Sequence, residues 1–152
     1  MKTFKGRPVL PGSVRGPALV SRQGFNTLAS FQKSVIAGSL TGRAKRAVCS
    51  DQDNRDLFGK VLTGTILCLP QTIGSTSGGL VLETVAAMGI APAAMLFSQS
   101  IDSLAASGVV LADVWVGKRI VAVDRLGDEF LQTVREGQQI EVGEDGTVTL
   151  LD

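Results

Sequence analysis

The chain has 152 residues, of which 44% are hydrophobic and 19% are charged, and its formal net charge is +1. This composition is too apolar for a disordered chain, and the length suits a single domain over residues 1–152. No histidine is present. A Ser-His-Asp triad, a His-ligated zinc site and a phosphohistidine carrier are therefore excluded for this chain alone.

The charged residues are unevenly spread along the chain. Residues 1–60 hold 11 Lys or Arg and 3 Asp or Glu, a balance of +8, whereas residues 61–152 hold 4 and 11, a balance of −7. This split predicts a face for an anionic substrate or an acidic partner, unless the charges are only solvated or paired within the chain. The basic residues lack interleaved aromatic residues, so we expect no nucleic-acid partner.

The first residues of the chain and its two cysteines indicate the cellular compartment. Residues 1–8 place charge and proline where a signal peptide would need an apolar stretch. Cys49 and Cys68 are too sparse for a disulfide framework and match no paired metal-ligand motif. We therefore expect a soluble cytoplasmic protein with reduced thiols, no metal site of its own and no membrane partner.

The first 60 residues predict two strands and then a long excursion. Residues 3–9 and 14–20 read as strands about a turn at Pro11 and Gly12, as in a hairpin or a barrel corner. Residues 21–60 show little regular pattern. Because long loops in compact domains usually serve function, we expect this excursion to face a substrate or a partner.

The second half predicts strands and helices that alternate. In chain order these are a strand at 61–69, a helix at 80–88 that ends at Gly89, a strand at 92–97, a helix at 101–112, a strand at 119–123, and a hairpin of strands at 139–142 and 147–150. A β-α-β-α-β unit between terminal strands predicts an α/β fold. We expect a mixed β barrel or sandwich with helices on one side.

The loop GSTSGG at residues 74–79 is the strongest candidate for chemistry. It joins a predicted buried strand to a helix, where free N–H groups and the helix dipole favour an anion. It lacks the lysine of a nucleotide-binding P-loop. Thr76 or Ser77 could simply cap the helix, but three adjacent hydroxyl groups and the flanking glycines favour a ligand that approaches the backbone closely.

A serine in this loop could act as a base only if its alkoxide were strongly stabilised. A helix N-terminus and a nearby arginine would supply the necessary field. Five arginines are candidates for that role, and the sequence does not separate them: Arg7, Arg15, Arg43, Arg46 and Arg55.

An ordered set of motifs resembles the small subunit, or swivelling domain, of aconitase X proteins. The motifs are GRPVLPGSVRGPALVS (residues 6–21), LFG (57–59), GTILCLP (64–70), GSTSG (74–78) and APAA (91–94). They run in order over nearly the whole chain. The resemblance implies a swivelling β/β/α domain that closes over a separate large subunit, and it implies that this large subunit holds an iron or iron–sulfur centre.

The resemblance also implies roles for the loop residues. Carried over by position, the base is Ser75, although the second serine of the loop, Ser77, is the alternative. Thr76 and Ser77, with the backbone at Gly74 and Gly78, would hold the anionic group of the substrate. The implied reaction is dehydration of a small hydroxy acid, in which the partner's metal accepts the leaving hydroxyl group as a Lewis acid.

Two substrates are implied by the family. One is cis-3-hydroxy-L-proline, which is dehydrated to pyrroline-2-carboxylate, and the other is phosphomevalonate in archaeal isoprenoid synthesis. The segment at residues 23–53, with its basic stretch at 43–46, departs from the pattern of the phosphomevalonate enzymes. We therefore favour hydroxyproline, with phosphomevalonate as the alternative, and a non-catalytic anion-binding interaction module as the rival from another class.

Overall fold

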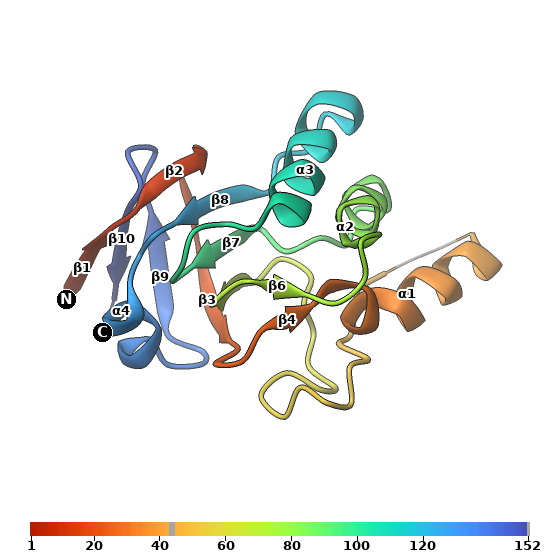
Figure 1. Ribbon diagram of the computed structural model, residues 1–152, viewed down its shortest axis with the longest axis horizontal. Helices are drawn as coiled ribbons and strands as arrows, with labels where there is room; N and C mark the ends of the chain where they lie inside the picture. Colours follow the sequence, from red (N-terminus) through yellow and green to blue (C-terminus); the bar gives the residue numbers. More distant parts are fainter. Residues whose placement is uncertain (43–44, 152) are drawn as a thin grey trace.

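Residues 1–42 and 45–151 are described by the computed structural model (Figure 1). The strands are β1 (Lys2–Lys5), β2 (Arg7–Leu10), β3 (Val14–Val20), β4 (Phe25–Asn26), β5 (Ile66–Leu69), β6 (Thr72–Ile73), β7 (Ala94–Phe97), β8 (Val121–Asp124), β9 (Gln139–Val142) and β10 (Thr147–Leu150). The helices are α1 (Thr27–Thr41), α2 (Gly78–Ala87), α3 (Ser103–Leu111), its π-helical continuation η1 (Ala112–Val116), and α4 (Asp128–Thr133). None of these helices is long and apolar enough to cross a membrane.

Eight strands form one mixed sheet in the order β1-β10-β9-β3-β5-β7-β8-β2. The central strands β3, β5, β7 and β8 run parallel, and the outer strands pair antiparallel with their neighbours. The two edge strands, β1 and β2, are consecutive in the chain with only Gly6 between them. The sheet therefore curls until its edges meet, as a nearly closed barrel.

Gly6 forms the corner at which the barrel closes. A Cβ atom there would lie 2.5 Å from Val123 Cγ1 and 2.7 Å from the carbonyl oxygen of Asp124, so only glycine fits. Of the two arrangements expected for the first strands, the hairpin is wrong. Strand β2 pairs with β8, and β3 pairs with β5 and β9, so the first strands lie in different parts of the sheet and form a barrel corner.

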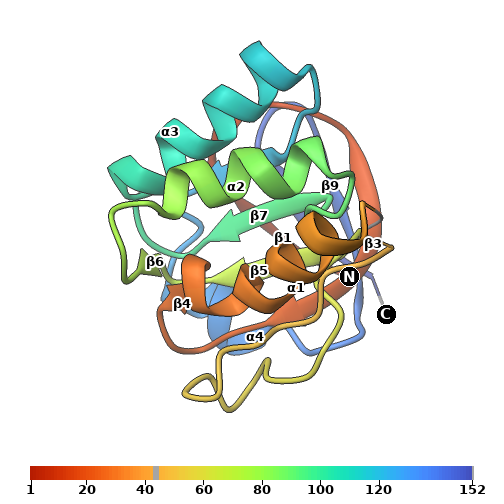
Figure 2. The same ribbon diagram turned by 90° about the vertical axis from the view of Figure 1, so that its right-hand side faces the viewer.

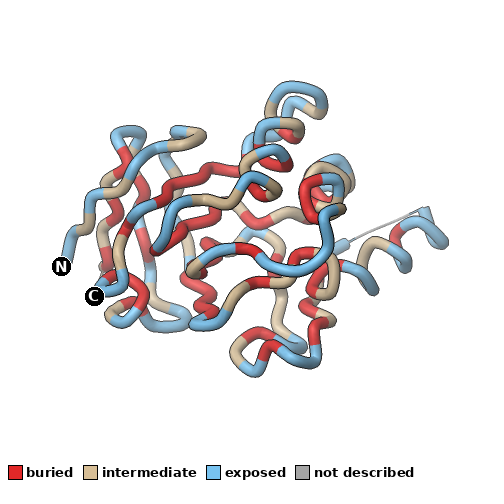
Figure 3. Tube along the Cα trace, in the orientation of Figure 1, coloured by how far each residue is buried: buried red, intermediate tan, exposed pale blue. Residues whose placement is uncertain are grey.

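Side chains of successive residues in the central strands point to opposite faces of the sheet and pack into two separate hydrophobic cores. One core lies between the sheet and the helices and contains Leu67, Leu69 and Phe97. The other fills the barrel and contains Ile66, Cys68 and Phe130 of α4. Helices α1, α2 and α3 cover one face of the sheet in Figure 2, and Figure 3 shows the central strands buried between these layers. The predicted α/β fold, a mixed barrel with helices on one side, is confirmed.

Helix α1 lies in the excursion for which little regular structure is expected, so that expectation is wrong for residues 27–41. The side chain of Asn26 caps the helix by accepting a hydrogen bond from the N–H of Ala29 at 3.0 Å. Phe31 is fully buried and packs edge-on against Phe25, with ring centroids 5.8 Å apart. The helix buries few apolar side chains, and this sparse stripe explains why its periodicity is hard to recognise.

Helices α2 and α3 touch backbone to backbone at Gly79 and Gly108. A Cβ atom on Gly108 would lie 2.8 Å from the carbonyl oxygen of Gly79 and 2.9 Å from its Cα. We expect Gly108→Ala to lower the free energy of unfolding by about 2 kcal/mol, because backbone atoms cannot move aside locally. Chemical denaturation measures this, with Ser103→Ala on the exposed side of α3 as the control. An unchanged free energy of unfolding in Gly108→Ala would contradict the close contact.

Candidate functional site

The loop at residues 74–77 lies where the carboxyl ends of the parallel strands meet the N-termini of three helices. It follows β5 and β6 and leads directly into α2. Helices α1, α2 and α3 all begin on the same side of the molecule, at the left of Figure 2. Their dipoles direct partial positive charge toward this edge, which favours an anionic ligand there.

A short parallel ribbon, β4 with β6, positions the start of the loop. Phe25 pairs with Thr72, and Asn26 pairs with Ile73, so that α1 and the loop begin side by side. Asp102, the cap of α3, holds the ribbon from the other side. Its carboxylate accepts hydrogen bonds from the N–H and the hydroxyl group of Thr72, at 2.9 and 2.6 Å. The loop is therefore fixed to two neighbouring helices before it reaches Ser75.

The hydroxyl groups of Ser75 and Ser77 lie within 2.8 Å of each other, so the structure brings both predicted serines together. The N–H of Ser77 donates to Ser75 Oγ at 3.2 Å. Ser77 makes no side-chain capping bond to α2, so the simple cap expected as the alternative is not formed by that residue. Ser75 and Thr76 are exposed, and in the described part of the chain Thr76 has no side-chain hydrogen bond.

Two glycines shape the loop for close approach. Gly74 has a φ of +97°, and a Cβ atom on it would lie 2.6 Å from Oδ1 and 2.7 Å from Nδ2 of Asn26. Gly78 is buried at the first position of α2, with Thr27 of α1 beside it. Gly74 is thus required by its backbone conformation, whereas a Cβ atom on Gly78 would make only ordinary contacts with Thr27, at 3.5 Å or more.

This geometry can stabilise negative charge at Ser75. Its oxygen already accepts one N–H bond and lies in contact with a second hydroxyl group, the pattern that lowers the energy of an alkoxide. Ser77 receives no N–H bond on its oxygen from the described residues. Of the two serines, Ser75 is therefore the better placed to act as a base, and Ser77 to donate to it.

Comparison with known proteins identifies the family of this chain. A family model described as the aconitase X swivel domain matches residues 3–150. The chain belongs to this family. A phosphomevalonate dehydratase small subunit from Methanocella arvoryzae is 31% identical over 98% of this chain and 97% of its own length, and one from Aeropyrum pernix is 28% identical over 97% and 92%. The crystal structure of Thermococcus kodakaraensis aconitase X has the same fold, with a TM-score of 0.81 at 24% identity and full coverage of both chains.

None of the described arginines expected beside Ser75 makes a hydrogen bond to the serine loop. Arg7 donates from Nε and Nη2 to the carboxylate of Asp124, at 2.9 and 2.6 Å. Arg15, Arg46 and Arg55 make no hydrogen bond to the loop, and Arg43 lies outside the described residues. No described candidate arginine therefore contacts Ser75.

Asp124 is the one fully buried carboxylate of the described chain, at the carboxyl end of β8. Burial opposes its ionisation, but hydrogen bonds from Arg7 and from the N–H of Ile101 outweigh this and lower its pKa. The pair joins β8 to β2 and to the segment that leads into α3. It is therefore a structural feature of the barrel corner.

Residues 1–42 and 45–151 contain no group of three His, Cys, Asp or Glu side chains that could hold a metal ion. Cys49 and Cys68 are both buried free thiols on opposite sides of the sheet. Burial also raises the pKa of the Cys68 thiol, which keeps it protonated. Cys68 is therefore a core residue.

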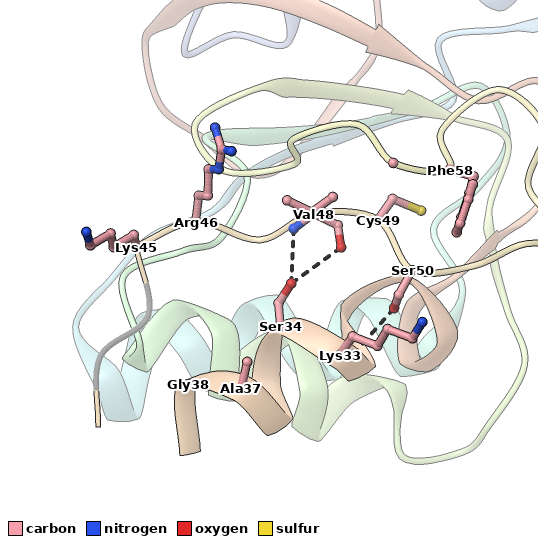
Figure 4. A pocket seen from close by; sticks show the side chains of 11 residues that line it. Lys33, Ser34, Ala37, Gly38, Lys45, Arg46, Val48, Cys49, Ser50 and Phe58 are labelled. Carbon is pink, nitrogen blue, oxygen red and sulfur yellow. Dashed lines mark hydrogen bonds between the residues drawn. The ribbon is translucent and has the colours of Figure 1, made fainter. Parts of the chain in front are cut away.

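A cavity lies away from the loop, between α1 and the irregular segment that follows it (Figure 4). It has a volume of about 390 Å³ and is lined by apolar atoms and by the cations Lys33, Lys45 and Arg46. Ser34 on its wall bonds both backbone groups of Val48, at 3.0 and 3.3 Å. No loop residue lines this cavity, so it forms no part of the site at Ser75.

Proposed function

We propose that this chain is the small subunit of an aconitase X-type dehydratase, and that its loop at residues 74–78 contacts the substrate. The single observation that carries the proposal is the contact of Ser75 and Ser77 at the uncapped start of α2, in a chain that matches the swivel family over residues 3–150. The relatives are named small subunits, which supports a larger partner for this chain.

In the proposed reaction Ser75 acts as the base. Its deprotonated Oγ takes the proton from the carbon next to the substrate's carboxylate, the electron pair of that C–H bond forms the new double bond, and the hydroxyl group leaves from the neighbouring carbon. Ser77 and the N–H groups at the start of α2 stabilise the alkoxide and the carboxylate, on which negative charge develops. Thr76 is exposed beside them and adds a third hydroxyl group.

The family resemblance implies an iron or iron–sulfur centre in the large subunit. The described residues of this chain do not fit such a group, because they bring no three metal-ligating side chains together and both thiols are buried. We therefore assign to this chain the proton and the carboxylate, and no step at the leaving hydroxyl group.

Phosphomevalonate is the better-supported substrate. Our preference for cis-3-hydroxy-L-proline rests on the segment at residues 23–53 alone. The relatives that match nearly the whole chain are named phosphomevalonate dehydratase small subunits, and this favours the alternative. The serine loop suits the carboxylate of either substrate, so the choice depends on the relatives and not on the loop.

An assay of the assembled enzyme tests the substrate. The chain is co-expressed with the large aconitase X subunit of the same organism and purified without oxygen, and kcat/KM is measured for both hydroxy acids. We expect phosphomevalonate to be preferred by at least about tenfold. A preference for hydroxyproline overturns the substrate assignment, and turnover of neither compound overturns the dehydratase proposal itself.

A further inference from the structure

Asn26 lies beside the serine loop although 48 positions separate it from Gly74 in the sequence. The pairing of β4 with β6 brings the two together, and the packing is tight. The Cβ position of Gly74 lies 2.6 to 2.7 Å from Oδ1, Cγ and Nδ2 of Asn26, so the amide lies flat against the glycine. The residue therefore forms one wall of the site at Ser75.

The orientation of this amide is fixed by the helix that it caps. Its oxygen accepts the N–H of Ala29 at 3.0 Å, and only the oxygen can accept such a bond. The Nδ2 group must then lie on the opposite side of the amide. Among the described residues it has no hydrogen-bond acceptor, although Asn26 itself is half-buried. Two N–H donors are thus free next to the exposed residues Gly74 and Ser75.

We propose that Asn26 is a substrate-binding residue, whose Nδ2 donates a hydrogen bond to the carboxylate of the hydroxy acid held beside Ser75. The inference rests on the proposed function, since it takes the same loop to be the substrate site. It adds a donor from α1 to those from the loop and from α2. The carboxylate then lies between two helix N-termini, because Thr27 of α1 also adjoins Gly78 of α2.

A neutral amide suits this position. The nearby Asp102 is fully engaged with Thr72 and with the N–H of Ala105. A donor on a half-buried amide gives a hydrogen bond to a charged group, and loss of such a bond typically weakens binding about tenfold to a hundredfold. The oxygen of Asn26 caps α1, and its nitrogen donates to the substrate. A substitution can remove the donor and keep the cap.

Two substitutions at Asn26 test the proposal in the assembled two-subunit enzyme. Asn26→Ser keeps a capping oxygen and removes the donor without adding charge, and we expect KM to rise about tenfold with kcat nearly unchanged. Asn26→Asp keeps the cap and the shape but turns an acceptor toward the carboxylate, and we expect KM to rise about a hundredfold. Both variants should keep the unfolding midpoint of the wild type, since serine and aspartate are good caps.

Gln71→Glu is the matched control, because it makes the same amide-to-carboxylate exchange at an exposed residue just before β6. We expect its KM to stay within about threefold of the wild type. A wild-type KM in Asn26→Ser overturns the inference, as does an equal rise in KM for Gln71→Glu and Asn26→Asp. A wild-type complex that dehydrates neither hydroxy acid overturns the proposed function instead, and that result is visible before any variant is made.

Discussion

Ser75→Ala in the assembled enzyme is expected to lower kcat about a thousandfold. The substitution removes the oxygen that takes the proton, and general-base catalysis typically contributes a factor of this order. The side chain is exposed, and within residues 1–42 and 45–151 its only hydrogen bonds are to Ser77, so the fold should not change. Steady-state kinetics, with size-exclusion chromatography of the complex, measures both effects.

Ser77→Ala separates the two serines. This variant keeps the N–H that Ser75 accepts and loses only the neighbouring hydroxyl group. We expect kcat to fall about tenfold, the loss of one donor to a developing charge. If Ser77→Ala is the more damaged variant, the base is Ser77. If neither variant loses turnover, the loop is only an anion-binding surface, as in an interaction module.

Asp124→Ala is expected to lower the free energy of unfolding by about 3 kcal/mol at pH 7. The substitution removes a buried carboxylate that accepts bonds from Arg7 and from the N–H of Ile101, and it leaves that N–H without a partner. Urea denaturation monitored by circular dichroism measures the difference. Asp113→Ala is the control, since Asp113 binds Arg119 in the same two-bond geometry on the surface.

The pH dependence of this difference has a definite sign. The folded protein holds the pKa of Asp124 below its ordinary value, so the carboxylate contributes stability above about pH 4, and that contribution is lost as the pH falls through the lowered pKa. The gap between wild type and Asp124→Ala should therefore shrink below about pH 4. A gap that stays constant from pH 7 to pH 3 would contradict the ionised pair.

The sequence reveals the serine loop because its signal is local. The motif consists of hydroxyl side chains between glycines, after an apolar strand and before a helix. It can be recognised without knowing how the rest of the chain folds. Asn26 carries a local signal too, as a good helix cap, but its contact with Gly74 depends on the pairing of β4 with β6, whose partner residues are 47 positions apart. Helix propensity alone cannot show that contact.

The barrel closure is hidden for a related reason. Residues 3–9 are expected to form one strand, but Gly6 divides them into β1 and β2. They lie instead at the two ends of the sheet order because Gly6 fits tightly against Val123 and because β1 pairs with the last strand, β10. The positions of β1 and β2 in the sheet therefore depend on packing between residues that lie far apart in the sequence. The alternating strands and helices of the second half are predicted much better, because β5, β7 and β8 pair with one another over short stretches of sequence.

Reconstitution from separate subunits tests the central claim most directly. The chain and the large aconitase X subunit are purified apart without oxygen and mixed at increasing ratios, and dehydration of phosphomevalonate is followed. We predict that this chain alone is inactive, that activity rises with added chain until the large subunit is saturated, and that Ser75→Ala saturates at the same ratio without restoring turnover. A large subunit that is fully active by itself, or that never binds this chain, would contradict the account.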